Sequence, residues 1–246
     1  MKVAKRSGKL EEFNEEKIET CAIRTCEGIA DVSSTELVFN SRIKLYDGVK
    51  TTEIDEALIK SARGMIEEEP NYKYVAARLL LSTIYKEVFG EGVDSDALEL
   101  QYRKTFIVNL KKLIKEGIAS KELRKFNLVE LSNYIKIERD QNFAYLGLQT
   151  VYDRYLMHID NKRMEPPQGF WMRVAMGLAI KEDKDNKTEW AKRFYDVLSN
   201  FDFMSSTPTL FNSGGTFNQL SSCFLNTFED SINGIFDGVQ QEALKN

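Results

Sequence analysis

Residues that bind metals or form disulfides are scarce in this sequence. Its 246 residues include three cysteines and one histidine. Cys21 and Cys26 lack the C-x-x-C spacing of a metal or redox motif, and Cys223 stands alone. A structural zinc site usually draws on about four such ligands. We therefore expect no metal centre on this chain.

Long apolar runs are missing too. No segment approaches the roughly 20 apolar residues of a membrane-spanning helix. The N-terminal MKVAKRSGKLEEF lacks the apolar core of a secretory signal. A net charge of −4 gives no overall attraction for nucleic acid or for an anionic membrane. These absences predict a cytoplasmic protein with no membrane or nucleic-acid partner.

The common glycine-rich phosphate-binding motifs do not occur. There is no G-x-x-x-x-G-K-S/T and no G-x-G-x-x-G, so Gly214-Gly215 is interpreted as a turn. A loop or short hairpin is predicted around Asp160-Asn161 and Pro166-Pro167. His158 lies at its start, and no convincing serine and aspartate arrangement accompanies it. A surface histidine is therefore favoured over a catalytic one.

The sequence does contain clear helical periodicity. It is 42% hydrophobic and 29% charged, a balance typical of a globular protein of one or two domains. VAKRSGKLEEF predicts a strand pair around a Ser7-Gly8 turn. Helices are predicted after an Asn14 N-cap, over Ser34–Leu45, from Thr51 or Thr52 to Glu68, over Tyr72–Phe89, and through most of residues 94–200.

The first predicted helix carries two of the cysteines. One apolar face of this helix consists of Ile18, Cys21, Ala22, Thr25, Cys26 and Ile29. Both thiols are therefore expected in the core rather than in redox chemistry.

The last part of the sequence has a different composition. From Phe201 it is rich in Ser, Thr, Gly and aromatic residues, which predicts loops and short strands. Asp230 and Ser231 are suited to cap a final helix. Its apolar face would comprise Ile232, Ile235, Phe236, Val239 and Ala243.

A group of basic residues near the N-terminus suits a phosphate. Lys5, Arg6 and Lys17 cluster around the strand pair and a helix start, where free backbone N–H groups favour an anion. Lys86 could approach the same point. On these residues alone, a solvated basic patch explains the cluster at least as well.

Cys223 also has two interpretations. It is either a small core residue or a redox thiol. Redox chemistry needs a second thiol, and neither of the other cysteines is obviously within reach, so the partner would lie on another chain.

Several motifs occur in the order in which one enzyme family carries them. They are VAKRSGKLEEFNEEKI, YDGVKTTEI, NYKYVAARLLLSTIYK, IERDQNFAYLGLQTVYDRYL, EPPQGFWMRVAMGLA, SSTPTLFNSGG, QLSSCFL and EDSINGIFD. Together they resemble the large (alpha) subunit of aerobic class I ribonucleotide reductase over essentially the whole chain.

The resemblance implies a mainly α fold with three parts. Residues 1–93 would be a regulatory ATP-cone helical module, and residues 94–205 a helical domain. Residues 206–246 would start a ten-stranded α/β barrel that another chain completes. The radical-bearing cysteine and the second electron-donor cysteine would lie beyond Asn246, because the subunit is naturally split or because this chain is a truncated product.

The resemblance also implies roles for residues near the end. Cys223 would be one of two thiols that supply electrons to the ribose 2′ carbon and end as a disulfide. Thr207, Ser222 and Cys223 would hold the substrate, a ribonucleoside diphosphate. A deoxynucleoside triphosphate that selects the base would contact Asp230, Ser231 and Ile232.

In the cone, the resemblance implies a site for ATP as activator or dATP as inhibitor, bound with Mg²⁺. The contacts would be Lys5, Arg6, Glu11, Glu12, Phe13, Asn14, Glu15, Glu16, Lys17, Thr51 and Lys86. One departure concerns Asp55, which stands where familiar members have a histidine that contacts the nucleotide. A carboxylate beside a triphosphate lowers affinity unless a cation offsets it. We therefore expect weak nucleotide binding or a loss of regulation.

The implied activity is reduction of ribonucleoside diphosphates, catalytically complete only with further chains. These partners would be a polypeptide carrying the rest of the alpha barrel, a small beta subunit whose metal supplies the radical, and thioredoxin or glutaredoxin. Two alternatives are a non-catalytic ATP/dATP-sensing module that docks on a reductase and an all-helical structural protein. The substrate-type segments STPTL, SSC and EDS favour the reductase fragment, because a pure sensor does not need them.

Overall fold

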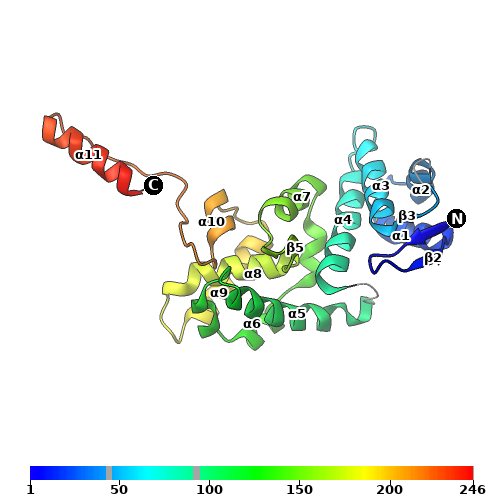
Figure 1. Ribbon diagram of the computed structural model, residues 1–246, viewed down its shortest axis with the longest axis horizontal. Coiled ribbons are helices and arrows are strands. Elements are labelled where there is room, and N and C mark those ends of the chain that lie inside the picture. Colours follow the sequence, from blue (N-terminus) through cyan, green and yellow to red (C-terminus); the bar gives the residue numbers. More distant parts are fainter. Residues whose placement is uncertain (43–45, 91–94, 246) are drawn as a thin grey trace.

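The computed structural model describes residues 1–42, 46–90 and 95–245. Their fold is mainly helical, as predicted, with two small sheets. Figure 1 shows an N-terminal lobe, a helical body, and an arm that ends in α11 (Ile232–Lys245). No helix in these ranges is long and apolar enough to cross a membrane.

The N-terminal lobe begins with the predicted strand pair. β1 (Lys2–Ala4) and β2 (Leu10–Glu12) are antiparallel. Gly8 closes the turn because it tolerates a φ of 84°, and its N–H donates to the Lys5 carbonyl. β3 (Val49–Lys50), which was not predicted, pairs with β1 in parallel. The sheet therefore ties the first residues of the chain to the start of the third helix.

Four helices complete this lobe. They are α1 (Glu15–Cys26), α2 (Ser34–Arg42), α3 (Thr51–Gly64) and α4 (Tyr72–Phe89). The predicted cap of α1 is confirmed, because Asn14 Oδ1 accepts a hydrogen bond from the Glu16 N–H at 2.8 Å. α3 ends at Gly64 rather than at the expected Glu68. The Met65 N–H donates to the carbonyls of Ser61 and Ala62, and the chain then continues in turns. Residues 43–45, where the second predicted helix was to end, lie outside the described residues.

α4 joins the lobe to the body. One side of α4 packs on α1 and α3, and another side packs on α7 (Tyr145–Arg154). Buried residues therefore occur on more than one face of this helix, among them Val75, Leu79 and Leu81.

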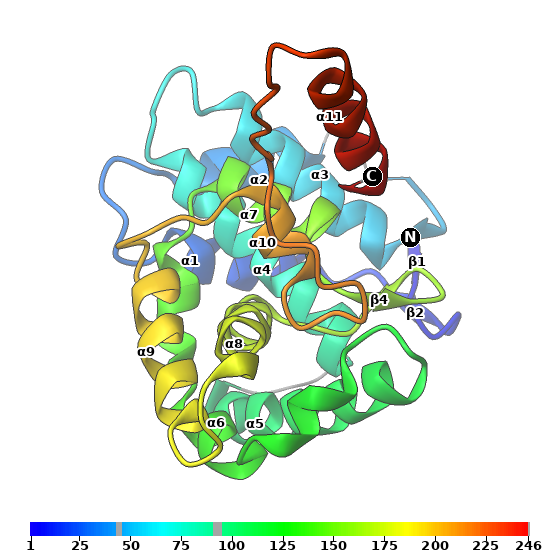
Figure 2. The ribbon, with the colours of Figure 1, turned by 90° about the vertical axis from the view of Figure 1, so that its left-hand side faces the viewer.

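The centre of the body is α8 (Pro167–Leu178), which is buried from Pro167 to Gly177. Figure 2 shows this helix end-on with the other helices around it. The predicted hairpin is confirmed as β4 (His158–Ile159) and β5 (Lys162–Arg163). The remaining elements are α5 (Ser95–Lys115), η1 (Lys121–Lys125), α6 (Leu128–Tyr134), η2 (Ile137–Asn142), η3 (Ala179–Lys181) and α9 (Lys187–Ser199).

The chain after Phe201 differs from the expected loops and short strands. α10 (Thr207–Asn212) is a short helix with a proline in its first turn. Residues 217–230 pair with no strand in the described part of the chain. A segment becomes a sheet strand only when a neighbour pairs its backbone groups, so these residues do not form the expected barrel strand by themselves. Ser231 caps α11 as predicted, because its Oγ accepts from the Gly234 N–H at 3.0 Å.

Candidate functional site

A cavity of about 260 Å³ lies between the β1–β2 hairpin, α1, the start of α3 and the end of α4. Apolar side chains line part of it, including Ile18, Ile54 and Leu58. The family resemblance assigned eleven residues to a nucleotide site in the cone. This cavity is lined by all of them except two. The lining residues are Lys5, Arg6, Glu11, Glu12, Phe13, Asn14, Lys17, Thr51 and Lys86. Glu15 and Glu16 lie just beyond it, exposed in the first turn of α1.

Ion pairs organise the charges of this cavity around two carboxylates. Arg6 Nη2 lies 2.9 Å from one oxygen of Asp55, and Lys86 Nζ lies 2.8 Å from the other. The Asp55 side chain is only 15% exposed. Glu11 pairs more loosely with Lys5, at 3.6 Å, and with Lys17, at 3.8 Å. The negative charge of Asp55, which stands where familiar members have a histidine, is thus offset by two cations from different elements.

The start of α3 adds hydrogen-bond donors to the cavity wall. Thr51 Oγ1 is buried and finds no hydrogen-bond partner among the described residues. The N-cap residue Lys50 makes no side-chain cap bond in the same set. Buried polar atoms are usually satisfied, and the first N–H groups of a helix attract anions. Both features suit an anionic ligand.

The two cysteines of α1 have different environments. Cys26 is buried, as expected for a core residue, whereas Cys21 is half-buried and lines the cavity. Burial raises the pKa of the Cys21 thiol, although the nearby Lys86 ammonium acts in the opposite direction. A thiol with a raised pKa stays protonated at neutral pH and is a weak nucleophile.

The residues expected at a substrate site lie elsewhere, after the helical body. Thr207 begins α10, and its Oγ1 lies 3.2 Å from the Tyr155 hydroxyl. Both residues line a second cavity of about 480 Å³. Sequence reasoning did not identify Tyr155, because the contact joins residues far apart in the chain.

Ser222 and Cys223 lie on the segment that follows α10, and both are exposed. This segment is attached to the helix by side-chain bonds: Asn212 Nδ2 donates to the Gln219 carbonyl at 2.6 Å, and the Thr209 hydroxyl donates to the Leu220 carbonyl at 3.0 Å. These bonds fix the start of the segment.

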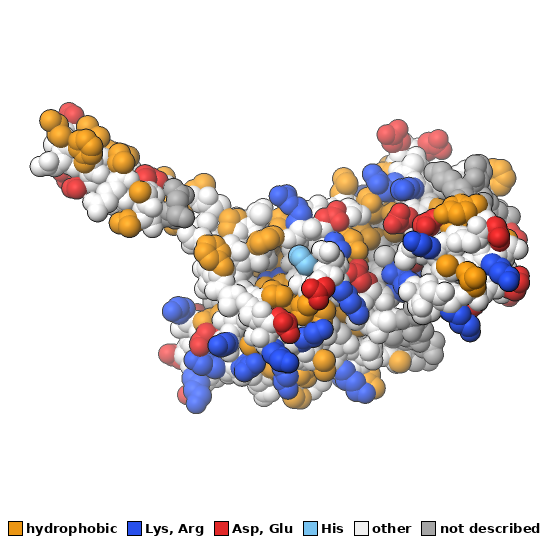
Figure 3. Space-filling view, viewed as in Figure 1, with side chains coloured by type: hydrophobic (Ala, Val, Ile, Leu, Met, Phe, Trp, Pro, Cys, Tyr) orange, Lys and Arg blue, Asp and Glu red, His pale blue; other side chains and the backbone are white. Residues whose placement is uncertain are grey.

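Asp230, Ser231 and Ile232 stand exposed at the start of α11. Figure 3 shows hydrophobic side chains gathered along this arm. The exposed apolar residues include Leu225, which is 97% exposed, together with Phe224, Phe228, Ile232, Ile235, Phe236, Val239 and Leu244.

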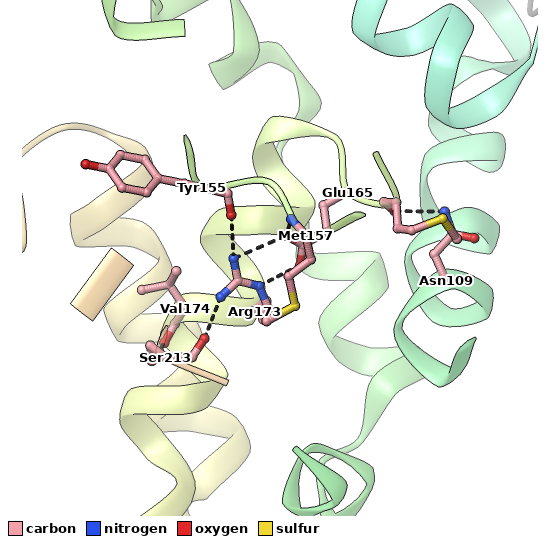
Figure 4. A network of polar contacts seen from close by, with 8 residues as sticks. Asn109, Tyr155, Met157, Glu165, Arg173, Val174 and Ser213 are labelled. Carbon is pink, nitrogen blue, oxygen red and sulfur yellow. Dashed lines mark hydrogen bonds and ion pairs between the residues drawn. The ribbon is translucent and has the colours of Figure 1, made fainter. Parts of the chain in front are cut away.

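A buried ion pair anchors the end of α10. Arg173, on α8, is fully buried and donates through Nε to Glu165 at 2.6 Å (Figure 4). Its other nitrogens donate to the carbonyls of Ser213 at 2.5 Å and Tyr155 at 3.1 Å. One signal in the sequence could have predicted this network, because Arg173 is the only charged residue in the apolar stretch GFWMRVAMGLA, and a buried charge needs partners.

A second buried network connects the lobe to the body. Asp140 is fully buried and accepts hydrogen bonds from Tyr85 of α4 at 2.6 Å, from Tyr102 at 3.1 Å and from Gln168 at 3.0 Å. Burial raises the pKa of Asp140 to about 6, although the three donors act in the opposite direction. Burial likewise raises the pKa of Tyr85 and Tyr102 well above the ordinary tyrosine value.

Metal-ligand clusters do not occur in the described ranges. Within residues 1–42, 46–90 and 95–245, no group of three or more His, Cys, Asp or Glu could hold a metal ion. His158 is exposed, as predicted, and Figure 3 shows its side chain at the surface.

Comparisons with protein families match two parts of the chain. The "ATP cone domain" matches residues 1–87, and the domain described as "Ribonucleotide reductase, all-alpha domain" matches residues 141–218. Three curated relatives are similar over most of the chain. The "Ribonucleoside-diphosphate reductase subunit alpha" of Chlamydia muridarum is 44% identical over 214 residues, or 85% of the chain. The protein of the same name in Helicobacter pylori is 38% identical over 244 residues, or 98% of the chain. The "Ribonucleoside-diphosphate reductase 1 subunit alpha" of Salmonella typhimurium is 29% identical over 236 residues, or 95% of the chain.

The match covers a minor part of these relatives. The chain spans 20% of the Chlamydia protein and 30% of each of the other two.

Proposed function

Because this chain is related over most of its length to alpha subunits of ribonucleoside-diphosphate reductase, we propose that it supplies the effector-binding cone and helical region of such a subunit. The observation that carries the proposal is the cavity of the N-terminal lobe. An ATP cone binds a nucleotide effector, and the match to this domain includes every lining residue of the cavity.

In this proposal, ATP as activator or dATP as inhibitor occupies the cavity together with Mg²⁺. The four cations Lys5, Arg6, Lys17 and Lys86 suit the phosphates. The Thr51 hydroxyl and the first N–H groups of α3 can donate to the same oxygens. The apolar part of the wall suits the base.

The catalytic part of the proposal concerns Cys223. Its thiol and a second thiol, from another part of the alpha barrel, form a disulfide and give up two electrons. The ribose C2′–O bond breaks, the oxygen leaves as water, and a C2′–H bond forms. A small beta subunit with a metal supplies the initiating radical, and thioredoxin or glutaredoxin reduces the disulfide. The exposure of Cys223 is compatible with this role. The segment that joins α10 to α11 lies well away from α1 (Figure 1).

Two further groups of residues have proposed contacts in the complete subunit. Thr207 and Ser222 help to hold the ribonucleoside diphosphate beside Cys223. Asp230, Ser231 and Ile232 contact the deoxynucleoside triphosphate that selects the base. The exposed apolar residues of α11 support such an assembly, because a large apolar surface is usually covered by a partner.

Replacement of Cys223 tests the catalytic role. In the reductase purified with its natural partners, Cys223→Ser should lower multi-turnover reduction of ribonucleoside diphosphate by at least about 100-fold, because the disulfide can no longer form. The control is Cys26→Ala, which removes a buried thiol of the lobe and should retain activity. Unchanged turnover by Cys223→Ser would instead favour a non-catalytic nucleotide-sensing module that docks on a reductase.

A further inference from the structure

We propose that Asp55 is a gate on the nucleotide cavity, whose carboxylate competes with the phosphates of a bound nucleotide for Arg6 and Lys86. This inference rests on the proposed function of the cavity as a nucleotide site. It assigns to Asp55 the regulation of affinity at that site.

The geometry of the three side chains is the basis of the proposal. Arg6 lies in the turn of the β1–β2 hairpin, Asp55 on α3 and Lys86 in the last turn of α4. Each oxygen of Asp55 has its own cation, at 2.9 Å and 2.8 Å. One carboxylate therefore holds half of the cations in the cavity, and it does so by joining three elements.

Burial distinguishes this carboxylate from the other acidic residues of the cavity. The Asp55 side chain is 15% exposed, whereas that of Glu11 is 32% exposed. The cations paired with Glu11 lie at 3.6 Å and 3.8 Å, beyond hydrogen-bond distance. Screening by water weakens exposed pairs more than buried ones. Lys5 and Lys17 can therefore turn toward a phosphate more easily than Arg6 and Lys86.

The charge of the cavity points in the same direction. Its lining has four cations against three carboxylates, which are Glu11, Glu12 and Asp55. This small excess of positive charge is little for a triphosphate, and a phosphate that approaches Arg6 or Lys86 also meets the charge of Asp55. Removal of the Asp55 charge should take away a competitor of the ligand for both cations. Mg²⁺ on the nucleotide reduces the repulsion, so the gate should act most strongly without it.

Nucleotide titration with matched variants tests the gate. ATP is titrated by calorimetry into the wild-type chain, Asp55→Asn and Glu56→Gln, with and without Mg²⁺. Glu56 follows Asp55 on α3, pairs with the exposed Lys60 at 3.9 Å, and is not among the residues that line the cavity. Asp55→Asn should bind ATP at least tenfold more tightly than the wild type without Mg²⁺, and by a smaller factor with it. Glu56→Gln carries the same charge change and should bind within twofold of the wild type.

A second measurement does not depend on whether Asp55→Asn folds. In a structure of the wild-type chain with bound ATP, the Arg6–Asp55 and Lys86–Asp55 distances should both exceed 4 Å. Equal or weaker binding by folded Asp55→Asn, or ATP bound with both ion pairs intact, overturns the gate but leaves the nucleotide site. No ATP binding by the wild type and both variants overturns the proposed nucleotide site and the gate together.

Discussion

Two ionic centres of the described chain, one in the N-terminal cavity and one in the helical body, are built from similar side chains but differ in their contact with water. In the N-terminal cavity, the side chains of Arg6 and Lys86 are 22% and 35% exposed beside Asp55. In the body, Arg173 and Glu165 are 0% and 6% exposed. Arg173 also donates to two backbone carbonyls, and Glu165 accepts from the Met157 N–H. Charges that retain contact with water can exchange partners at modest cost, whereas fully buried ones cannot. The first centre is therefore suited to a ligand, and the second to holding a segment in place.

Removal of the buried cation gives the largest expected effect. Arg173→Met should lower the free energy of unfolding by about 3–5 kcal/mol, because Glu165 and two backbone carbonyls lose their buried partner. Urea unfolding followed by circular dichroism measures this change. The matched control is Arg193→Met, which removes a 61% exposed arginine that pairs with Glu189 at 3.8 Å, and it should cost less than about 1 kcal/mol. Similar losses of unfolding free energy in both variants would contradict the distinction between buried and water-exposed ion pairs.

The buried Asp140 should make stability depend on pH. Its pKa rises from 3.8 to about 6 in the folded chain. Between these values the folded state keeps a proton that the unfolded state releases, so the free energy of unfolding should fall as the pH rises through this window. At about 1.4 kcal/mol per pH unit, the loss amounts to about 3 kcal/mol.

Asp140→Asn isolates this contribution from that of other groups. The free energy of unfolding of the wild type minus that of Asp140→Asn should fall by about 3 kcal/mol between pH 3 and pH 7. Urea titrations at several pH values measure it. A difference that stays constant with pH would show that burial does not govern the ionisation of Asp140.

Local signals explain most of what the sequence predicted correctly. The Gly8 turn and the Asn14 and Ser231 caps depend on neighbours within a few residues. Lys5, Arg6 and Lys17 were grouped because they lie close together in the sequence, but on these residues alone a solvated patch explained the cluster equally well. The full set of cavity residues came from the family resemblance.

Contacts between distant residues explain what was missed. β3 is only two residues long, and its pairing with β1 joins segments more than 40 residues apart. The Asp55 ion pairs join three separate elements, so sequence reasoning identified the residue but not its partners. The segment around Cys223 was expected to be a strand, yet the described chain provides no neighbour to pair with it. Sequence pattern predicts where such residues lie along an element, but not which distant group they meet.

ATP binding by Lys86→Gln, compared with the wild type, tests the central claim most directly. Calorimetric titration should give measurable ATP binding by the wild-type chain and at least tenfold weaker binding by Lys86→Gln, a difference of about 1.4 kcal/mol. Lys60→Gln removes an exposed cation of α3 that is not among the cavity residues, and it should bind like the wild type. Absence of ATP binding by the wild type, or equal affinity in Lys86→Gln, would contradict the assignment of this cavity as the nucleotide site.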